Sequence, residues 1–233
     1  MKLIKDMYEL NLSDKSSENY KEYWKYQNGR SGGPHNHNQV FKDLYEFIPD
    51  DKEPSVKTNF GLSEEDYIID VGCRGGQMIE YFHESGFKNT YGFDIGDNAE
   101  KTWDEIINEK YRKFLFKWDA HDKLTKFKDK KFKLITSSHL LEHCFDPKKV
   151  MGNFHEMLSD DGILHTQFPF DDYDSWKKRE HKPHYAYWKD ENDWKEFLSD
   201  CGFTMAWSVR DWRCEEWELR SFAFKTDNLK NMI

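Results

Sequence analysis

The feature that most constrains the fold is an alternation that begins at residue 67, where short runs of β-branched and aromatic residues alternate with longer amphipathic segments. The runs cover residues 67–71, 89–95, 114–120, 132–138 and 163–168. A strand followed by a helix and another strand is typical of parallel sheets with crossover helices. The pattern therefore predicts an α/β fold with a doubly wound, mostly parallel sheet.

Two further strand-like runs lie near the end of the chain, over residues 203–210 and 216–225. They follow a helix expected over residues 190–199, which should end at Cys201 and Gly202. Because a short turn should join them, we expect an antiparallel C-terminal hairpin at the edge of the sheet. The other expected helices cover residues 75–86, the surroundings of Trp103 and Ile107, and residues 147–158, with a polar turn at 159–162.

Residues 1–60 precede the first clear strand. Helical spacing occurs around Tyr23 and around Leu44, and a stretch rich in Gly, Pro and Asn over residues 29–38 separates the two. We therefore expect residues 1–60 to form a helical extension or lid with a flexible joint. Residues 61–233 should form the main domain.

Composition narrows the protein class. The 233 residues suit one large domain, and 9 Trp, 12 Tyr and 18 Phe are too many rings for a disordered chain. A net charge of −9 argues against nucleic acid or anionic lipid as partners, and the lysine run over residues 123–133 is interpreted as a solvated connection. The four scattered cysteines indicate reduced thiols and no structural zinc site. Because no membrane-spanning run and no signal peptide are visible, we expect a soluble cytoplasmic protein. The oligomeric state stays open.

A glycine-rich turn, Asp70-Val71-Gly72-Cys73-Arg74-Gly75-Gly76, follows the first strand. Ligands of open α/β sheets bind at the carboxyl ends of the strands, where glycines allow close backbone approach and a helix N-terminus offers free N–H groups. The dinucleotide pattern GxGxxG is absent, because Arg74 and Gln77 occupy its later glycine positions. A cofactor other than NAD or FAD should therefore bind here.

The turn resembles the first motif of the class I S-adenosylmethionine (SAM) dependent methyltransferases, an acidic residue followed by GxGxG. Asp70, Gly72 and Gly76 match this motif, and Arg74 replaces its central glycine. The replacement is compatible with the motif if the adjacent Gly75 adopts the unusual backbone conformation.

Three later segments match further motifs of the family. Asp94 ends the second strand, where the resemblance implies a carboxylate that binds the ribose diol. Asp119 follows the third strand, where it implies contact with adenine, and His139 is expected at the end of the fourth strand, beside the methionine end of the cofactor. The likeness, clearest over residues 65–170, implies a seven-stranded Rossmann-like sheet, SAM as cofactor and no metal. The cofactor-binding residues it implies are Asp70, Gly72, Cys73, Arg74, Gly75, Gly76, Asp94, Ile95, Asp119, Ala120, Ser138 and His139.

Histidines supply the candidate bases for an acceptor proton, since imidazole titrates near neutral pH. We assign this role to His143, with His139 or His184 as substitutes, while a structural role for His143 stays equally open. The segment His139-Leu140-Leu141-Glu142-His143 also matches the HxxEH pattern of zinc peptidases. That alternative is weak, because the motif follows a core strand and no companion motif supplies a third ligand.

The acceptor is expected to be a small polar molecule that is methylated on a hydroxyl or amine. Acids, imidazoles and rings over residues 170–188 suit a sugar, although an ordinary loop with Tyr185 and Trp188 packed on the core fits equally well. His35 and His37 read as a polar turn. The alternatives are a SAM-binding protein without catalysis, which Arg74 leaves open, and a nucleic-acid methyltransferase, whose motifs are absent after the fourth strand.

Overall fold

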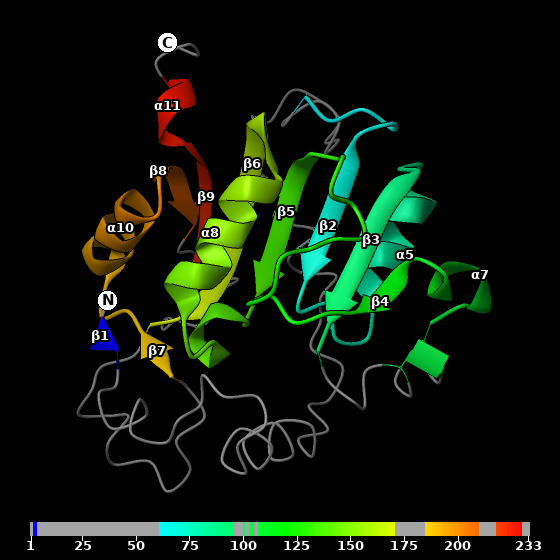
Figure 1. Ribbon diagram of the computed structural model, residues 1–233, viewed down its shortest axis with the longest axis horizontal. Coiled ribbons are helices and arrows are strands. Elements are labelled where there is room, and N and C mark those ends of the chain that lie inside the picture. The colour runs from blue at the N-terminus through cyan, green and yellow to red at the C-terminus, as the bar shows by residue number, and fades with distance from the viewer. Residues whose placement is uncertain are drawn as a thin grey trace, which may run out of the picture.

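The computed structural model describes residues 2–3, 61–95, 100, 103–104, 107–170, 185–209 and 218–229. Seven strands form one sheet in the order β4-β3-β2-β5-β6-β9-β8 (Figure 1). The strands of this sheet are β2 (Tyr67–Val71), β3 (Asn89–Asp94), β4 (Leu115–Lys117), β5 (Phe132–Ser138), β6 (Leu158–Pro169), β8 (Phe203–Val209) and β9 (Glu218–Lys225). Two short strands, β1 (Lys2–Leu3) and β7 (Ala186–Tyr187), pair separately and antiparallel.

The connectivity confirms the predicted fold class. Strands β4, β3, β2, β5 and β6 are parallel, whereas β9 is antiparallel to both β6 and β8. The chain moves outward from β2 to β3 and β4, then returns to the other side of β2 with β5. Strand order therefore reverses between β2 and β5, which is where a ligand site is expected in such a sheet.

Helices cover both faces of the sheet, with α8 on one face and α5 on the other (Figure 1). The described helices are α5 (Gln77–Glu84), α7 (Glu109–Arg112), the 3₁₀ turn η1 (Leu141–His143), α8 (Pro147–Met157), α10 (Glu191–Asp200) and α11 (Thr226–Leu229). Helix α8 begins with Pro147 and is capped by the Asp146 side chain, while Asp190 caps α10. Gly202, with a φ of 81°, follows α10 and lets the chain turn into β8.

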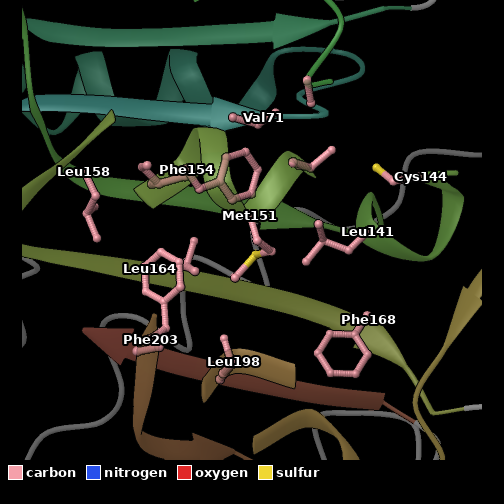
Figure 2. Close-up of a cluster of buried hydrophobic side chains, with 14 of the residues drawn as sticks. Val71, Leu141, Cys144, Met151, Phe154, Leu158, Leu164, Phe168, Leu198 and Phe203 are labelled. Carbon is pink, nitrogen blue, oxygen red and sulfur yellow. The ribbon is translucent and has the colours of Figure 1, made fainter. Parts of the chain in front are cut away.

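The core has two main parts because side chains alternate between the faces of each strand. Ile69 and Ile135 face α8, whereas Ile68 and Leu134 belong to the cluster that includes Phe82 of α5. Figure 2 shows Val71, Met151 and Phe154 turned toward one another between the sheet and α8. Burial on both faces explains why the strand sequences are nearly continuous apolar runs.

Local details differ from the sequence-based expectations. Residues 159–162 lie within β6, whose pairing with β5 passes from Leu158 to Ile163 so that the polar turn becomes a bulge. Helix α7 was not expected, because four residues are too few for a periodic signal. Apart from Lys2–Leu3, which form β1, the proposed lid over residues 1–60 and its joint lie outside the described residues, as does the hairpin connection 210–217.

Candidate cofactor and active site

The glycine-rich loop sits at the carboxyl end of β2 and is fixed to the neighbouring strand. The backbone N–H groups of Gly72 and Cys73 both donate to the carbonyl oxygen of Phe93, at 2.8 and 3.0 Å. Gly72 and Gly76 have φ values of 80° and 79°, which favour glycine. Gly76 immediately precedes α5, and no side chain caps that helix start. The loop thus presents backbone to the place where a cofactor would bind.

Arg74, and not Gly75, adopts the left-handed conformation within the loop. Its φ is 42°, so Arg74 itself takes the backbone conformation that the sequence analysis considered for Gly75. The backbone N–H of Arg74 donates to Asp94 Oδ2 at 2.8 Å, and its carbonyl accepts from the indole N–H of Trp103. A left-handed backbone costs a non-glycine residue roughly 1–2 kcal/mol of conformational energy, and these two hydrogen bonds offset that cost.

Close packing also favours glycine at two positions of the loop, because a Cβ there would press on a neighbouring leucine side chain. A Cβ at Gly76 would lie 2.7 Å from Leu115 Cδ1, closer than carbon atoms pack. A Cβ at Gly72 would lie 3.3 Å from Leu140, so the segment after β5 packs directly on the glycine-rich loop. Leu140 thereby joins the first and fourth motifs at one edge of the sheet.

Asp94 and the turn that contains Asp119 lie on neighbouring strands. Asp94 pairs with Lys117 in the register of β3 and β4, and the Trp118 N–H donates to the Asp94 carbonyl at 2.9 Å. Asp119 Oδ1 accepts from the backbone N–H of His121 at 2.9 Å and lies 2.8 Å from His121 Nδ1. Ile95 directly follows β3, and Ala120, three residues after the end of β4, is buried.

Asp70 is buried below the loop, and its environment holds a proton. Burial raises its pKa to about 7, the Thr136 hydroxyl that donates to Oδ1 at 2.7 Å opposes this effect, and the nearby Asp94 charge adds to it. Burial also raises the pKa of the Cys73 thiol well above its ordinary value. Near pH 7 the thiol behind the loop is therefore neutral, whereas Asp70 is about half protonated.

The end of β5 carries a second strained residue beside a buried carboxylate. His139 has a φ of 52°, and its backbone N–H donates to the Gln167 carbonyl at 2.8 Å. His139 Nδ1 lies 3.2 Å from Glu142 Oε1; the histidine side chain is 38% exposed and that of Glu142 only 1%. Ser138 Oγ donates to Gln167 Oε1 at 3.3 Å, so both strand-end residues are held from β6.

His143 ends the 3₁₀ turn η1 and is half-buried. Because His139 is left-handed and precedes this short turn, the two histidines do not follow one another on an α-helix as the zinc peptidase pattern requires. Within the described ranges, no three His, Cys, Asp or Glu side chains are grouped to hold a metal ion. His35, His37 and His184 lie outside the described residues.

Residues from the expected acceptor loop divide into two groups. Tyr185, Tyr187 and Trp188 are buried, and Trp188 packs against Phe168 and Trp194 of the core at ring distances of 4.9 and 5.0 Å. The acids and histidines of that loop, at positions 171–184, lie outside the described residues. The lysine run contacts its own chain, through Lys123 with Glu156, Lys126 over Phe116, Lys130 over Tyr67, Lys131 with the Glu156 carbonyl and Lys133 with Asp161.

Sequence reasoning missed four residues that build this edge. Trp103 holds the Arg74 carbonyl, Leu140 packs on Gly72, and His121 contacts Asp119. Glu142 was noticed only as part of the zinc pattern. Its position three residues after His139 was the available signal, since that spacing allows a carboxylate to meet an imidazole.

The donors and acceptors at this edge suit an adenosyl cofactor. Asp94 offers a carboxylate for a ribose diol, and the turn at Asp119 offers backbone and carboxylate groups to a purine. Gly72 and Gly76 let the loop turn tightly against Leu140 and Leu115 at the carboxyl end of β2. These groups come from the ends of β2, β3 and β4, which are adjacent strands.

Known proteins with related sequences are named as methyltransferases. A family model described as a methyltransferase domain matches residues 34–213. Ubiquinone biosynthesis O-methyltransferase from Nitrosospira multiformis is 31% identical over 110 residues, 47% of this chain and 45% of that protein. Its namesake from Nitrosomonas europaea is 28% identical over 131 residues, 54% of this chain and 52% of that protein. The chain spans about half the length of these curated relatives.

Solved structures share the fold at low sequence identity. Magnesium protoporphyrin IX methyltransferase from Synechocystis PCC 6803, solved with bound S-adenosylhomocysteine (SAH), has a TM-score of 0.58 at 14% identity and covers 95% of this chain and 100% of its own. A SAM-dependent methyltransferase from Aquifex aeolicus has a TM-score of 0.55 at 17% identity, covering 72% of this chain and 86% of its own.

No helix in the described part of the chain has both the length and the apolar character needed to span a membrane. The family match covers well over half of the chain, and the sheet order and the loop after β2 agree with it. The chain belongs to the methyltransferase domain family.

Proposed function

We propose that this enzyme methylates a hydroxyl oxygen of a small molecule and that His139 removes the hydroxyl proton. Two observations support the proposal. The curated relatives are named O-methyltransferases of ubiquinone biosynthesis, and a half-exposed imidazole at the end of β5 contacts a buried carboxylate. The second observation carries the assignment of the base.

The pairing of His139 with Glu142 prepares the ring for proton transfer. A buried carboxylate accepts hydrogen bonds, so Nδ1–H donates to Glu142 Oε1 over 3.2 Å and Nε2 keeps its lone pair. Nε2 can then accept a proton from an acceptor hydroxyl. The developing imidazolium charge would be stabilised by Glu142, whose side chain is 1% exposed.

The other groups at this edge would bind and orient the cofactor. Bound SAM supplies an electrophilic methyl group on a sulfonium, so the enzyme mainly has to align the acceptor oxygen and exclude water. Asp94 would bind the ribose, the turn at Asp119 the adenine, and the backbone from Gly72 to Gly76 the remainder of the cofactor. Ser138 and His139 would lie beside the sulfur end.

We prefer His139 to His143 as the base because His139 Nδ1 lies 3.2 Å from the buried carboxylate of Glu142, which can orient the ring. His143 stays the alternative base, and His184 is a third candidate on sequence grounds alone.

A phenolic or quinol hydroxyl is the acceptor class that the names of the relatives favour. The sugar acceptor suggested by the sequence receives less support. The rings that were expected to line its site, Tyr185 and Trp188, are buried in the core at 4% and 0% exposure.

The experiment measures transfer of labelled methyl from SAM to a catechol, an aminophenol, a hexose and a DNA oligonucleotide. We expect transfer to the catechol alone. Transfer to the oligonucleotide or hexose, with the catechol inert, would contradict the proposed acceptor class.

Variants then identify the base. His139→Ala should lower the rate by about 10²- to 10⁴-fold, the usual contribution of a general base, while SAH binding stays near wild type. Glu142→Gln should lower the rate less, because an amide still orients the ring. His155→Ala is the matched control, since His155 is a partly buried histidine that packs on Phe203 at the far end of α8. A large loss in His143→Ala and none in His139→Ala would reverse the assignment.

A further inference from the structure

The turn after β4, residues 119–122, is fastened from outside by α8 and by the residue before it. The side-chain amide of Asn153, on α8, donates to the carbonyl oxygens of Ala120 at 2.7 Å and Asp122 at 3.0 Å. Both bonds hold the backbone of the turn and leave the Asp119 carboxylate to a different partner.

That partner is His121, whose ring is 3% exposed. Its Nδ1 lies 2.8 Å from Asp119 Oδ1, and its Nε2 accepts from the backbone N–H of Asp146 at 3.4 Å. Phe145 stacks on the ring at 3.9 Å with an interplanar angle of 8°. Because Nε2 accepts, the proton lies on Nδ1 and is donated to Asp119.

The two contacts of this ring connect separate parts of the site. Asp119 is the residue assigned to the adenine end of the cofactor. The Asp146 side chain caps α8 by accepting a hydrogen bond from the backbone N–H of Lys149 at 3.0 Å. Asp146 is also the last residue of the segment 139–146, which contains His139 and Glu142. The Asp119 side chain is 9% exposed, and its Oδ1 accepts from both the backbone N–H and the ring Nδ1–H of His121. The ring therefore supplies the second donor that fixes the direction of this buried carboxylate.

We propose that His121 is a positioning residue that orients the Asp119 carboxylate for the cofactor and ties the adenine turn to the segment carrying the catalytic base. The proposal rests on the proposed function, because it takes the turn at Asp119 as the adenine site. His121 itself touches neither cofactor nor acceptor in this scheme.

Two substitutions separate the two contacts of the ring. His121→Asn keeps an N–H near the position of Nδ1 and can still donate to Asp119. His121→Gln reaches the position of Nε2 and can still accept from Asp146, but it loses the donor to Asp119. His121→Ala loses both, and His155→Ala is again the matched control.

The main measurement is SAH affinity by calorimetry on the full chain, which does not depend on turnover. We expect His121→Ala and His121→Gln to weaken SAH binding by about 10- to 100-fold, the range for partners that orient a binding group. His121→Asn should stay within about threefold of wild type. Equal losses in the Asn and Gln variants would show that the ring only fills space, and wild-type affinity in the Ala variant would overturn the proposal outright.

A second measurement covers variants that fail to fold. Nitrogen chemical shifts of His121 in the wild-type protein should indicate the tautomer protonated on Nδ1, and the Nε2 tautomer would contradict the arrangement. If wild-type protein itself binds no SAH, the proposed cofactor site fails. If it binds SAH but the variants do not discriminate, only the role of His121 fails.

Discussion

The Asp70→Asn variant should be more stable than the wild type near pH 8 and equal to it near pH 4. Burial raises the pKa of Asp70 from 3.8 to about 7, with Thr136 opposing and Asp94 reinforcing this shift. Between these values the folded chain holds a proton that the unfolded chain has lost. The stability contributed by the protonated carboxyl is complete below about pH 4 and is lost as the pH rises through about 7.

The size of the effect follows from the two pKa values. One pKa unit corresponds to about 1.4 kcal/mol, so the interval from 3.8 to about 7 corresponds to about 4 kcal/mol. Asn has nearly the shape of Asp, and its amide oxygen can still accept from Thr136 Oγ1, which lies 2.7 Å from Asp70 Oδ1. Removing the ionisable group should therefore remove the pH-dependent loss at little other cost.

Urea unfolding followed by tryptophan fluorescence, on cofactor-free protein at several pH values, measures the difference. We expect the gap between variant and wild type to grow from near zero to about 4 kcal/mol with rising pH. Thr136→Val serves as the control, because it removes the hydrogen bond that lowers the Asp70 pKa and should move the loss to higher pH. Parallel pH profiles for Asp70→Asn and wild type would refute the reasoning.

Three further predictions concern the loop and the sheet. Gly76→Ala should cost about 2–4 kcal/mol of unfolding free energy, because a left-handed alanine would also press on Leu115; a loss below about 1 kcal/mol in urea would contradict this. Arg74→Gly should bind SAH about as well as wild type, because glycine fits the φ of 42°; a loss of about tenfold or more by calorimetry would instead assign the Arg74 side chain to the cofactor. Burial lowers the pKa of His165 to about 3, so its contribution to stability falls as the pH drops from 6.5 toward 3. His165→Gln should remove this acid sensitivity. A thermal midpoint that falls equally with acid in the variant and in the wild type would contradict the prediction.

The strands were predictable because their residues are buried on both faces. Ile68 and Ile69, or Leu134 and Ile135, point to opposite sides of one strand and are all fully buried. Continuous apolar runs of this kind, separated by polar turns, are visible in the sequence without any knowledge of contacts. The four residues of α7 leave no such periodic trace.

The site was predictable only where local sequence determines it. Asp94 and Asp119 could be found because one ends β3 and the other lies two residues after β4. The left-handed backbone of Arg74 could not, because its two hydrogen-bond partners lie 20 and 29 residues away in the sequence. The partnership of His121 with Asp146 similarly spans 25 residues and depends on how α8 packs.

The tryptophans beside the loop give this enzyme a built-in optical reporter. Trp103 donates its indole N–H to the Arg74 carbonyl, and the backbone N–H of Trp118 donates to the carbonyl of Asp94. Trp188 and Trp194 are sealed in the core at 0% exposure and should emit unchanged when a ligand enters. SAH binding beside the loop should therefore change the intrinsic emission of the protein, so it can be followed with no attached dye.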